Sequence, residues 1–322
     1  MKKFDVVVIG ELNMDIILDK NNSFPELGKE ILSRQMKITL GSSSAICASN
    51  LSALGNRVVF LGKTGNDAMG EMVLNELNKS NVITTDVVRD DQYPTGTTVV
   101  LNYGDERAMI THQGVIEYFS FEDINWELVK QARHLHLSSF FIQPGLRKHI
   151  REIFSKAKSL GLTISFDPQW DPEENWEIDL GLLLPMVDIF LPNEKEFLAM
   201  TKTGSIADGI SGLSAGTCVV IKQGERGSTL CAEGEPSYIP AFFNKDIVDS
   251  VGAGDSFNAG FIHQFLKGLP LNECQEFGNL MGALNTTAAG GTTAFAETNT
   301  IIERATQKFG YSKSIRKKDE NN

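Results

Sequence analysis

The sequence DSVGAGDSFNAGF, which runs from Asp249 to Phe261, is the stretch that decides the fold. A polar loop interrupted by glycines leads directly into an amphipathic segment, so Asp255 falls where a helix is expected to begin. Gly252 and Gly254 have no Cβ, and the backbone around them can turn sharply and direct successive N–H groups to one point. The first turn of a helix adds unpaired N–H groups and the positive end of the helix dipole. The pattern predicts an anion site suited to phosphate oxygens, with Asp255 placed to take a proton from an attacking hydroxyl.

A four-residue GxGD pattern alone would favour an ordinary helix cap at Asp255, because Asp is a frequent N-cap and glycines are frequent in loops. The whole stretch is more specific. It closely resembles the C-terminal signature of the ribokinase-like (phosphofructokinase B type) carbohydrate kinases. The resemblance implies that Asp255 is the catalytic base and that the backbone of Gly252, Ala253 and Gly254 forms an anion hole.

The resemblance extends over about residues 4–310. It implies a three-layer α/β/α fold with a mostly parallel central sheet and a small lid of β-strands. It also implies phosphorylation of a hydroxymethyl group of a small sugar, with ATP and Mg²⁺ as cofactors; ribose, fructose and 2-keto-3-deoxygluconate types of acceptor all remain open. The alternatives are a nucleoside kinase and a non-catalytic sugar or nucleotide sensor on the same scaffold. The intact Gly-Ala-Gly-Asp favours an enzyme, because a sensor needs no base at an anion hole.

The composition restricts the class of protein. With 322 residues, of which 41% are hydrophobic, the chain can bury a large core. Its formal net charge of −11 argues against nucleic-acid and anionic-membrane partners, which require a basic face. Cys47, Cys218, Cys231 and Cys274 have no metal-ligand spacing and are interpreted as reduced thiols. The apolar run at residues 6–9 is too short for export or for a membrane span, so we expect a cytoplasmic protein.

Short β-branched segments alternate with helical patterns, which is typical of βαβ units and a largely parallel sheet. Loops that end in Asp, Asn or Gly follow the predicted strands, at the edge where ligands bind in open α/β sheets. The expected strands are Val6–Gly10, Val58–Leu61, Leu135–Ser138, Thr163–Asp167, Ile189–Pro192 and Cys218–Lys222, and the expected helices are Ala45–Leu54, Ala68–Asn78, Leu146–Leu160, Glu194–Thr201, Ser256–Lys267 and Leu271–Ala288.

Two segments interrupt this alternation. Ile16–Ile38 reads as extended chain around a polar loop, and Thr97–Thr111 reads as a hairpin that turns near Gly104 and Asp105. Neither pattern requires a helix, so both are expected to form strands outside the main sheet.

The resemblance implies that these segments, at about residues 11–38 and 95–113, form a lid that closes over the sugar and makes a homodimer contact. A lid suits a kinase because the exclusion of water suppresses hydrolysis of the nucleotide. A surface hairpin without a gating role remains open on the sequence alone. Residues 1–310 are expected to form a single domain, and the charged residues 311–322 a frayed or disordered tail.

Candidate acceptor ligands lie near the N-terminus. Asp15 and Asn13 follow the first predicted strand, where a carboxylate and an amide can bind vicinal hydroxyl groups. The resemblance implies sugar binding by Asp15 and Asn13. It also implies a substrate-contacting hinge at Gly41 and the next residue, which here is Ser42 instead of the usual glycine. Ile46 stands where ribokinases have a sugar-binding asparagine, so the sugar pocket is expected to differ from that of a ribokinase.

Candidate nucleotide ligands lie in the second half of the chain. Asn193 and Glu196 open a predicted helix, three residues apart on one face, and through water they can hold Mg²⁺. A capping box explains the same residues equally well. Lys222, at a strand end before the Gly224 turn, can neutralise a terminal phosphate. The resemblance assigns both motifs to the ATP phosphates and places Asn279 beside the adenine pocket.

The resemblance also implies a monovalent-cation loop. Asp249 and the backbone of Val251 align with it, together with carbonyl groups near residues 289–293, so activation by K⁺ is a prediction. Arg107, on the predicted lid, could bind a carboxylate of the acceptor or could simply be solvated.

Two further patterns are ambiguous. His134 and His136 alternate on a predicted strand, but no third ligand is spaced to complete a metal site, which favours packed histidines. Asp167 ends a strand that faces the site, where its carboxylate could assist the metal or cap a turn; capping is the simpler interpretation.

Overall fold

The structure is a computed structural model that describes residues 2–19, 21, 23–103, 106–213, 216, 218–232 and 236–311. Its body is built on a sheet with the strand order β14-β13-β12-β11-β10-β9-β1-β4. Neighbours from β4 to β12 are parallel, whereas β13 and β14 add an antiparallel edge. The strands are β1 (Phe4–Ile9), β4 (Val58–Leu61), β9 (Ala132–Ser138), β10 (Thr163–Asp167), β11 (Ile189–Phe190), β12 (Cys218–Lys222), β13 (Gly227–Cys231) and β14 (Ser237–Pro240).

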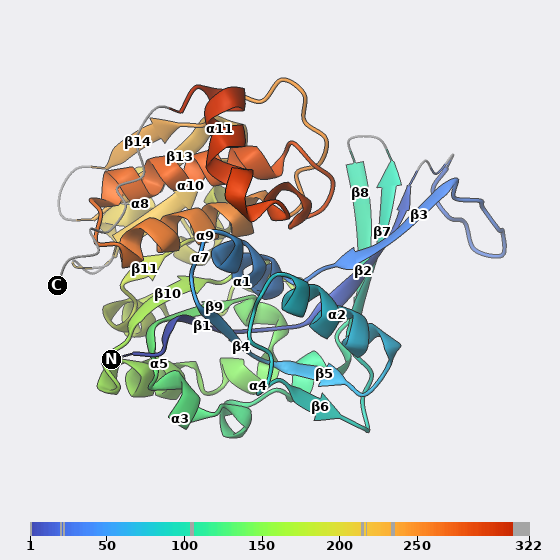
Figure 1. The fold of residues 1–322 in the computed structure, drawn as a ribbon, viewed down its shortest axis with the longest axis horizontal. Helices are drawn as coiled ribbons and strands as arrows, with labels where there is room; N and C mark the ends of the chain where they lie inside the picture. Colours follow the sequence, from blue (N-terminus) through green and yellow to red (C-terminus); the bar gives the residue numbers. More distant parts are fainter. Residues whose placement is uncertain are drawn as a thin grey trace.

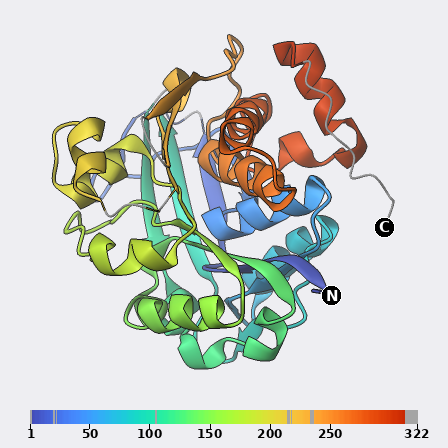
Figure 2. The ribbon, with the colours of Figure 1, turned by 90° about the vertical axis from the view of Figure 1, so that its left-hand side faces the viewer.

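Helices cover both faces of this sheet (Figures 1 and 2). Side chains alternate between the faces of a strand, so Val7 and Ile9 of β1 pack into one core while Val6 and Val8 pack into the other. The first core is covered by α3 (Trp126–Val129), α4 (Pro144–Arg147), α5 (Ile150–Ser159), α6 (Leu180–Leu183), α7 (Glu194–Thr201) and α8 (Ile206–Ser211). The second is covered by α1 (Ser43–Ala53), α2 (Ala68–Lys79), α9 (Ala253–Leu266) and α10 (Leu271–Asn285), and α11 (Ile301–Phe309) packs against α10. The predicted three-layer α/β/α fold is confirmed.

A second sheet projects from one side of the body (Figure 1). Its strand order is β3-β2-β7-β8, formed by β2 (Asn13–Asp19), β3 (Gln35–Leu40), β7 (Gly96–Tyr103) and β8 (Glu106–His112). The segments predicted to lie outside the main sheet form these strands, and the predicted hairpin turn at Gly104 and Asp105 lies outside the described residues. A short pair of strands, β5 (Lys63–Gly65) and β6 (Val88–Asp90), lies nearby. In the part of the chain that the structure describes, no helix has both the length and the apolar composition needed to cross a membrane.

Of the six predicted helices, α7 has the predicted bounds, α1 and α2 differ from them by one or two residues, and the other three differ by more. The helix expected over Leu146–Leu160 is divided into α4 and α5, because the backbone at His149 (φ −114°, ψ 14°) leaves the helical region. The last long helix ends at Asn285, three residues early. The helix after the glycine loop begins at Ala253 instead of Ser256, with Gly252 as its N-cap. Asp255 therefore lies inside the first turn, and its interpretation as an N-cap is wrong.

The sequence did not predict β13, β14 or α11. The end of the described chain is also more ordered than expected, because Tyr311 is buried against Phe242 and Phe277. The rest of the predicted tail, residues 312–322, lies outside the described residues.

Candidate active site

Two clefts meet at the start of α9. The first, of about 470 Å³, lies between the second sheet and the carboxyl ends of the central strands. The second, of about 400 Å³, is mainly apolar and lies between β13, the 241–250 loop and α10. The two clefts share Lys222, Gly224, Ser250 and Gly254. A third cavity, of about 540 Å³ beside α6 and α8, shares no residue with either of them. The junction of the first two clefts is therefore the place where groups bound in each would come together.

The glycines at this junction have distinct geometric roles. Gly252 has a φ of 76°, in the left-handed region, and a Cβ there would lie 2.5 Å from the Cα of Gly291. A Cβ at Gly254 would make ordinary van der Waals contact with Lys222, whose Nζ would lie 3.7 Å away, so this glycine is not required by crowding. The N-terminus of α9 has no side-chain cap. The Ala253 N–H donates to the Ser250 carbonyl (3.2 Å), whereas the N–H groups of Gly252 and Gly254 have no hydrogen-bond partner among the described residues and remain available to an anion at the meeting point of the clefts.

Asp255 lies in the first turn of α9 and is 7% exposed. Burial raises the pKa of its carboxyl group to about 8, and the charges of Asp167 and Glu11 add to this, while Lys222 and a hydrogen bond from Ser43 act in the opposite direction. A carboxylate that is poorly solvated and faces a cleft is a competent proton acceptor near neutral pH.

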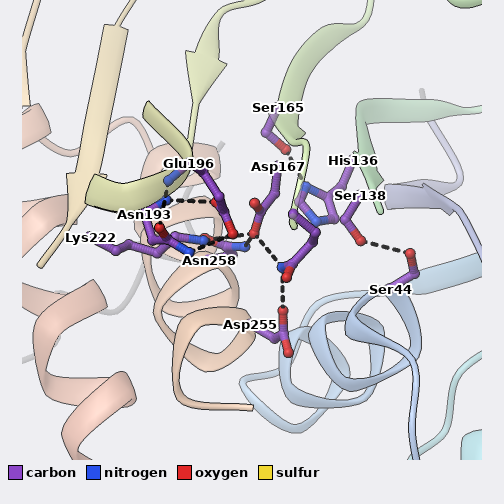
Figure 3. A network of polar contacts seen from close by, with 11 residues as sticks. Ser44, His136, Ser138, Ser165, Asp167, Asn193, Glu196, Lys222, Asp255 and Asn258 are labelled. Carbon is purple, nitrogen blue, oxygen red and sulfur yellow. Dashed lines mark hydrogen bonds and ion pairs between the residues drawn. The ribbon is translucent and has the colours of Figure 1, made fainter. Parts of the chain in front are cut away.

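Asp167 is the centre of the polar network in Figure 3. It is fully buried, and its Oδ2 accepts hydrogen bonds from Lys222 Nζ (2.7 Å), Asn258 Nδ2 (2.5 Å) and Gln169 Nε2 (2.9 Å). Burial alone would lower the pKa of Lys222, but the charges of Asp167 and Glu196 outweigh it, so this pKa is raised and the ammonium stays charged. The Asp167 side chain does not cap a turn, so that interpretation is wrong; it holds a lysine at the meeting point of the clefts.

Asn193 and Glu196 form the capping box of α7. Asn193 Oδ1 accepts from the Glu196 N–H (2.9 Å), and Glu196 Oε2 accepts from the Asn193 N–H (2.8 Å). Burial, followed by the charge of Asp167, raises the pKa of Glu196 to about 7. Both residues also line the first cleft, as Lys222 does. Within the described ranges, no cluster of three His, Cys, Asp or Glu side chains could hold a metal on its own. One amide and one carboxylate fit Mg²⁺, which keeps most of its water and binds phosphate oxygens.

The wall contributed by the second sheet contains Asp15. Its Oδ1 accepts from Asn13 Nδ2 (2.9 Å), which also donates to Thr98 Oγ1 (3.3 Å). Burial raises the pKa of Asp15 to about 6, although Asn13 and the charge of Arg107 act against it. Asn13 and Gly41 do not line the cleft as predicted. Asn13 supports Asp15 from behind, and Gly41 leaves room for it, since a Cβ there would lie 2.2 Å from Asp15 Oδ1.

The structure shows what the two residues that depart from the family pattern, Ser42 and Ile46, do instead. Ser42 has a φ of 63°, which costs a non-glycine residue about 1–2 kcal/mol and which a glycine would adopt freely. Its hydroxyl donates to the Glu11 carbonyl (2.6 Å) and accepts from the Ala45 N–H (2.9 Å). Ser42 lines the cleft, but its hydroxyl is used by the protein. Ile46 packs against Gly252 and Gly291 and gives the cleft an apolar patch.

Sequence reasoning missed two residues of the site. Glu11, 3% exposed, accepts from Ser44 Oγ (2.5 Å), and burial raises its pKa. Gln169 bridges Asp167 and Asp255. Both follow the carboxyl ends of central strands, and that position is the signal that could have found them.

The apolar cleft contains the remaining predicted nucleotide ligands. Gly224 lies at its junction with the first cleft, and Asn279 lies on its wall, where Nδ2 donates to the carbonyls of Ile239 (3.2 Å) and Pro240 (3.4 Å). Gly282 lines this cleft where space is tight, since a Cβ there would lie 3.2 Å from the Ala253 carbonyl oxygen. A mainly apolar cleft that opens onto a helix N-terminus fits a nucleobase with its phosphates.

The predicted cation loop is closed by hydrogen bonds. Asp249 accepts from the N–H groups of Val251 and Gly290, both at 2.9 Å. The Val251 carbonyl accepts from Asn285 Nδ2 (2.6 Å), and Lys37 Nζ donates to the Ala289 carbonyl (3.3 Å). The carboxylate therefore holds the two loop segments together.

Comparisons with known proteins agree with this geometry. The family model of the pfkB family carbohydrate kinases matches residues 3–299. A 2-dehydro-3-deoxygluconokinase from Bacillus subtilis is 28% identical over 78% of this chain and 82% of its own length. A nucleoside kinase from Methanothermobacter thermautotrophicus is 27% identical over 97% of this chain and 98% of its own. The structure of a protein described as a ribokinase II from E. coli, in complex with ATP and Mg²⁺, is 22% identical, covers 94% of this chain and 99% of that one, and has a TM-score of 0.79.

The family match spans nearly the whole chain, and the glycine loop with Asp255, the two clefts and the three-layer fold all lie within it. The resemblance found at Asp249–Phe261 is confirmed. The chain belongs to the pfkB family of carbohydrate kinases.

Proposed function

We propose that this carbohydrate kinase transfers the γ-phosphoryl group of ATP to a hydroxymethyl group of a small sugar, with Asp255 as the general base. The observation that carries the proposal is the junction of the two clefts at the start of α9, where the buried carboxylate of Asp255 follows Gly254 in the chain and the buried Lys222 Nζ lies 3.7 Å from a Cβ built on Gly254. The sugar occupies the polar cleft and the nucleotide the apolar cleft, so the reacting groups meet at the backbone of Gly252, Ala253 and Gly254, where the N–H groups of the two glycines have no partner among the described residues.

In this proposal, each group at the junction has one task. Asp255 takes the proton of the attacking hydroxyl, and the helix N-terminus together with Lys222 offsets the charge on the transferred group. Mg²⁺ neutralises phosphate oxygens, and Asn193 and Glu196 are the residues that would hold it through water. Because the groups are positioned before the reaction, catalysis consists of orientation, charge neutralisation and one proton removal.

The lining of the polar cleft favours a sugar over a nucleoside. Asp15, Asn102 and Arg107 supply hydrogen-bonding groups, while Ile17 and Ile46 supply apolar surface. Among the described residues, no aromatic side chain lines this cleft to stack on a second base. Arg107 lines this cleft and would attract an anionic group of the acceptor, and a relative of this chain is named 2-dehydro-3-deoxygluconokinase. Acidic keto-deoxy sugars therefore belong first in the substrate panel.

A homodimer through the second sheet is also part of the proposal. The edge strand β8 exposes Met109 (59%) and Ile110 (68%), and the opposite edge strand β3 exposes Met36 (66%). Exposed edges that carry apolar side chains invite pairing with a second copy. Light scattering on a sizing column is expected to give twice the chain mass for the parent and one chain mass for Ile110→Lys. A parent protein with the mass of one chain would contradict the dimer.

Potassium activation rests on the family resemblance alone. It predicts that replacing K⁺ by tetramethylammonium lowers turnover and that Asp249→Asn removes the difference. Equal rates in the two salts would remove K⁺ from the account.

The experiment that tests the function is ADP release with Mg-ATP across a panel of pentoses, hexoses, keto-deoxy acids and nucleosides. One acceptor that gives turnover, with a phosphate ester at its hydroxymethyl carbon by ³¹P NMR, is the expected result. Tight ATP binding without turnover on any acceptor would favour the sensor, and turnover on nucleosides alone would favour a nucleoside kinase.

A further inference from the structure

The amide of Gln169 stands between the two buried carboxylates of the site. Its Nε2 donates one hydrogen bond to Asp167 Oδ2 (2.9 Å) and one to Asp255 Oδ1 (3.2 Å). An amide nitrogen has two hydrogens, so this group is fully used. The opposite orientation of the amide would place its carbonyl oxygen against both acceptors, and the contacts therefore fix which way the group faces.

The backbone of Gln169 is held in an unfavourable conformation to make this contact. Its φ is 62°, in the left-handed region, although glutamine is not one of the residues that adopt it readily. The preceding turn is anchored, because the carbonyls of Asp167 and Pro168 accept from the N–H groups of Ser139 (3.1 Å) and Phe140 (3.0 Å). Strained backbone that directs a side chain into a cleft is typical of functional sites.

The position of the side chain connects the base with the lysine. Gln169 lines the same cleft as Asp255, and Asp167 receives Lys222 on the oxygen that also accepts from Gln169. The Gln169 amide thus links the carboxylate of Asp255 on α9 to that of Asp167 on β10. Asp167 in turn holds the ammonium group of Lys222 on β12.

We propose that Gln169 is a positioning residue for Asp255: its amide holds Oδ1 of the base so that Oδ2 is directed at the acceptor hydroxyl. The inference rests on the proposed function of Asp255 and adds a residue to it. It predicts that loss of the amide reduces the rate of phosphoryl transfer while both substrates still bind, because both hydrogens of the amide nitrogen are donated to Asp167 and Asp255.

The test compares Gln169→Gly with the parent. Glycine removes the amide and also relieves the left-handed backbone, so the variant is expected to fold as well as the parent. We expect kcat to fall by about 10- to 100-fold, the effect expected when one hydrogen bond to a charged group is lost. Both KM values should stay within about threefold of those of the parent. Gln169→Glu keeps the length and removes both donors, and its kcat is expected to fall at least as far. Unchanged kcat in both variants would overturn the inference.

A pH profile separates positioning from a structural role. The charged groups around Asp255 are Asp167 on β10, Lys222 on β12 and Glu11 after β1. Loss of a donor to the ionised carboxylate favours its protonated form, so the acidic limb of kcat/KM should move to higher pH in Gln169→Gly. A purely structural defect would lower the rate at every pH alike, and such a result would contradict the proposal.

The matched control is Asn81→Gly. Asn81 is another amide residue with a left-handed backbone (φ 59°), exposed after α2 and outside both clefts. The Asn81→Gly substitution should leave kcat and the pH profile unchanged.

Combination with Asp255→Asn distinguishes two kinds of failure. If Gln169 acts through the base, Gln169→Gly should lower the residual rate of Asp255→Asn by less than about twofold, so the two effects do not add. An equal fold-loss in both backgrounds would overturn the inference alone. If Asp255→Asn itself retains parental turnover, the proposed function fails at the base and the inference fails with it.

Discussion

At the scale of single residues, burial sets the protonation of Asp255, the proposed general base. Asp255 is 7% exposed, and its pKa is raised to about 8, first by burial and then by the charge of Asp167. Removal of a proton from a hydroxyl requires the ionised carboxylate, so the active fraction of the free enzyme increases as the pH rises toward 8.

The first prediction is a pH–rate profile. With the acceptor varied, kcat/KM should increase about tenfold per pH unit well below the pKa, reach half of its maximum near pH 8 and level off about one pH unit above that. Glu196, with a pKa raised to about 7, titrates in the same range, so the limb is expected to be broader than that of a single group. A rate that is flat from pH 6 to 9 would contradict a buried base.

The second prediction concerns stability and has a definite sign. Asp255 binds its proton more tightly in the folded state than in the unfolded chain, where an Asp has a pKa of about 3.9. The contribution of the Asp255 carboxyl group to the free energy of unfolding is therefore fully present below about pH 4 and is lost as the pH rises through about 8. Asp255→Asn removes this dependence, so the melting temperature of the variant should exceed that of the parent at pH 8–9 and the two should converge near pH 4. Scanning calorimetry would contradict the argument if the variant were less stable at pH 9.

At the scale of secondary-structure elements, an ion pair joins two strands of the central sheet. Lys222 on β12 and Asp167 on β10 are 2.7 Å apart, and their side chains are 9% and 0% exposed. Removal of one partner would leave a buried charge, which costs about 3–5 kcal/mol.

The third prediction follows from this pair. Lys222→Met should lower the free energy of unfolding by about 3–5 kcal/mol in denaturant titrations, and Asp167→Asn in addition should restore much of it. Lys158→Met is the matched control, because its pair with Asp188 is 2.9 Å long but 38% and 28% exposed and should contribute less than about 1 kcal/mol. Equal losses for the two lysines would show that burial of the pair is unimportant.

The same elements show what the sequence could and could not predict. β4, β10, β12 and α7 have the predicted bounds, because each is a short, strongly patterned segment between clear turn residues. The start of α9 was placed too late, since Ala253 and Gly254 look like loop residues locally and are helical because the N-cap is Gly252. The bridge from Gln169 to Asp255 joins residues 86 positions apart, and no periodicity in the chain carries that information.

At the scale of the whole molecule, the two clefts have different walls, to which our proposal assigns the two substrates. The second sheet contributes Asp15 to the polar cleft, whereas the apolar cleft is built from β13, α9 and α10 without that sheet. The family resemblance led to Asp15 and Ser42, which line the polar cleft, and to Gly224 and Asn279, which line the apolar cleft. The sequence could not predict that the Ser42 hydroxyl is used in capping α1 or that Asn13 lies behind Asp15, because these depend on packing between segments.

The fourth prediction follows from this division. Asp15→Ala should raise the KM for the acceptor by about 10- to 100-fold, the loss of hydrogen bonds to a charged group. The KM for ATP should stay within about threefold, because Asp15 does not line the apolar cleft. Initial rates with each substrate varied in turn measure both constants, and a parallel rise of the two KM values would contradict separate walls.

The most direct measurement of the central claim is the single-turnover rate of Asp255→Asn with ATP and the acceptor identified by the panel, next to the equilibrium affinity for ATP. The substitution keeps the shape of the side chain and removes the base. Our account predicts a rate lower by about two to four decades with ATP affinity within a few-fold of the parent. A rate within a few-fold of the parent would contradict the assignment of Asp255 as the general base.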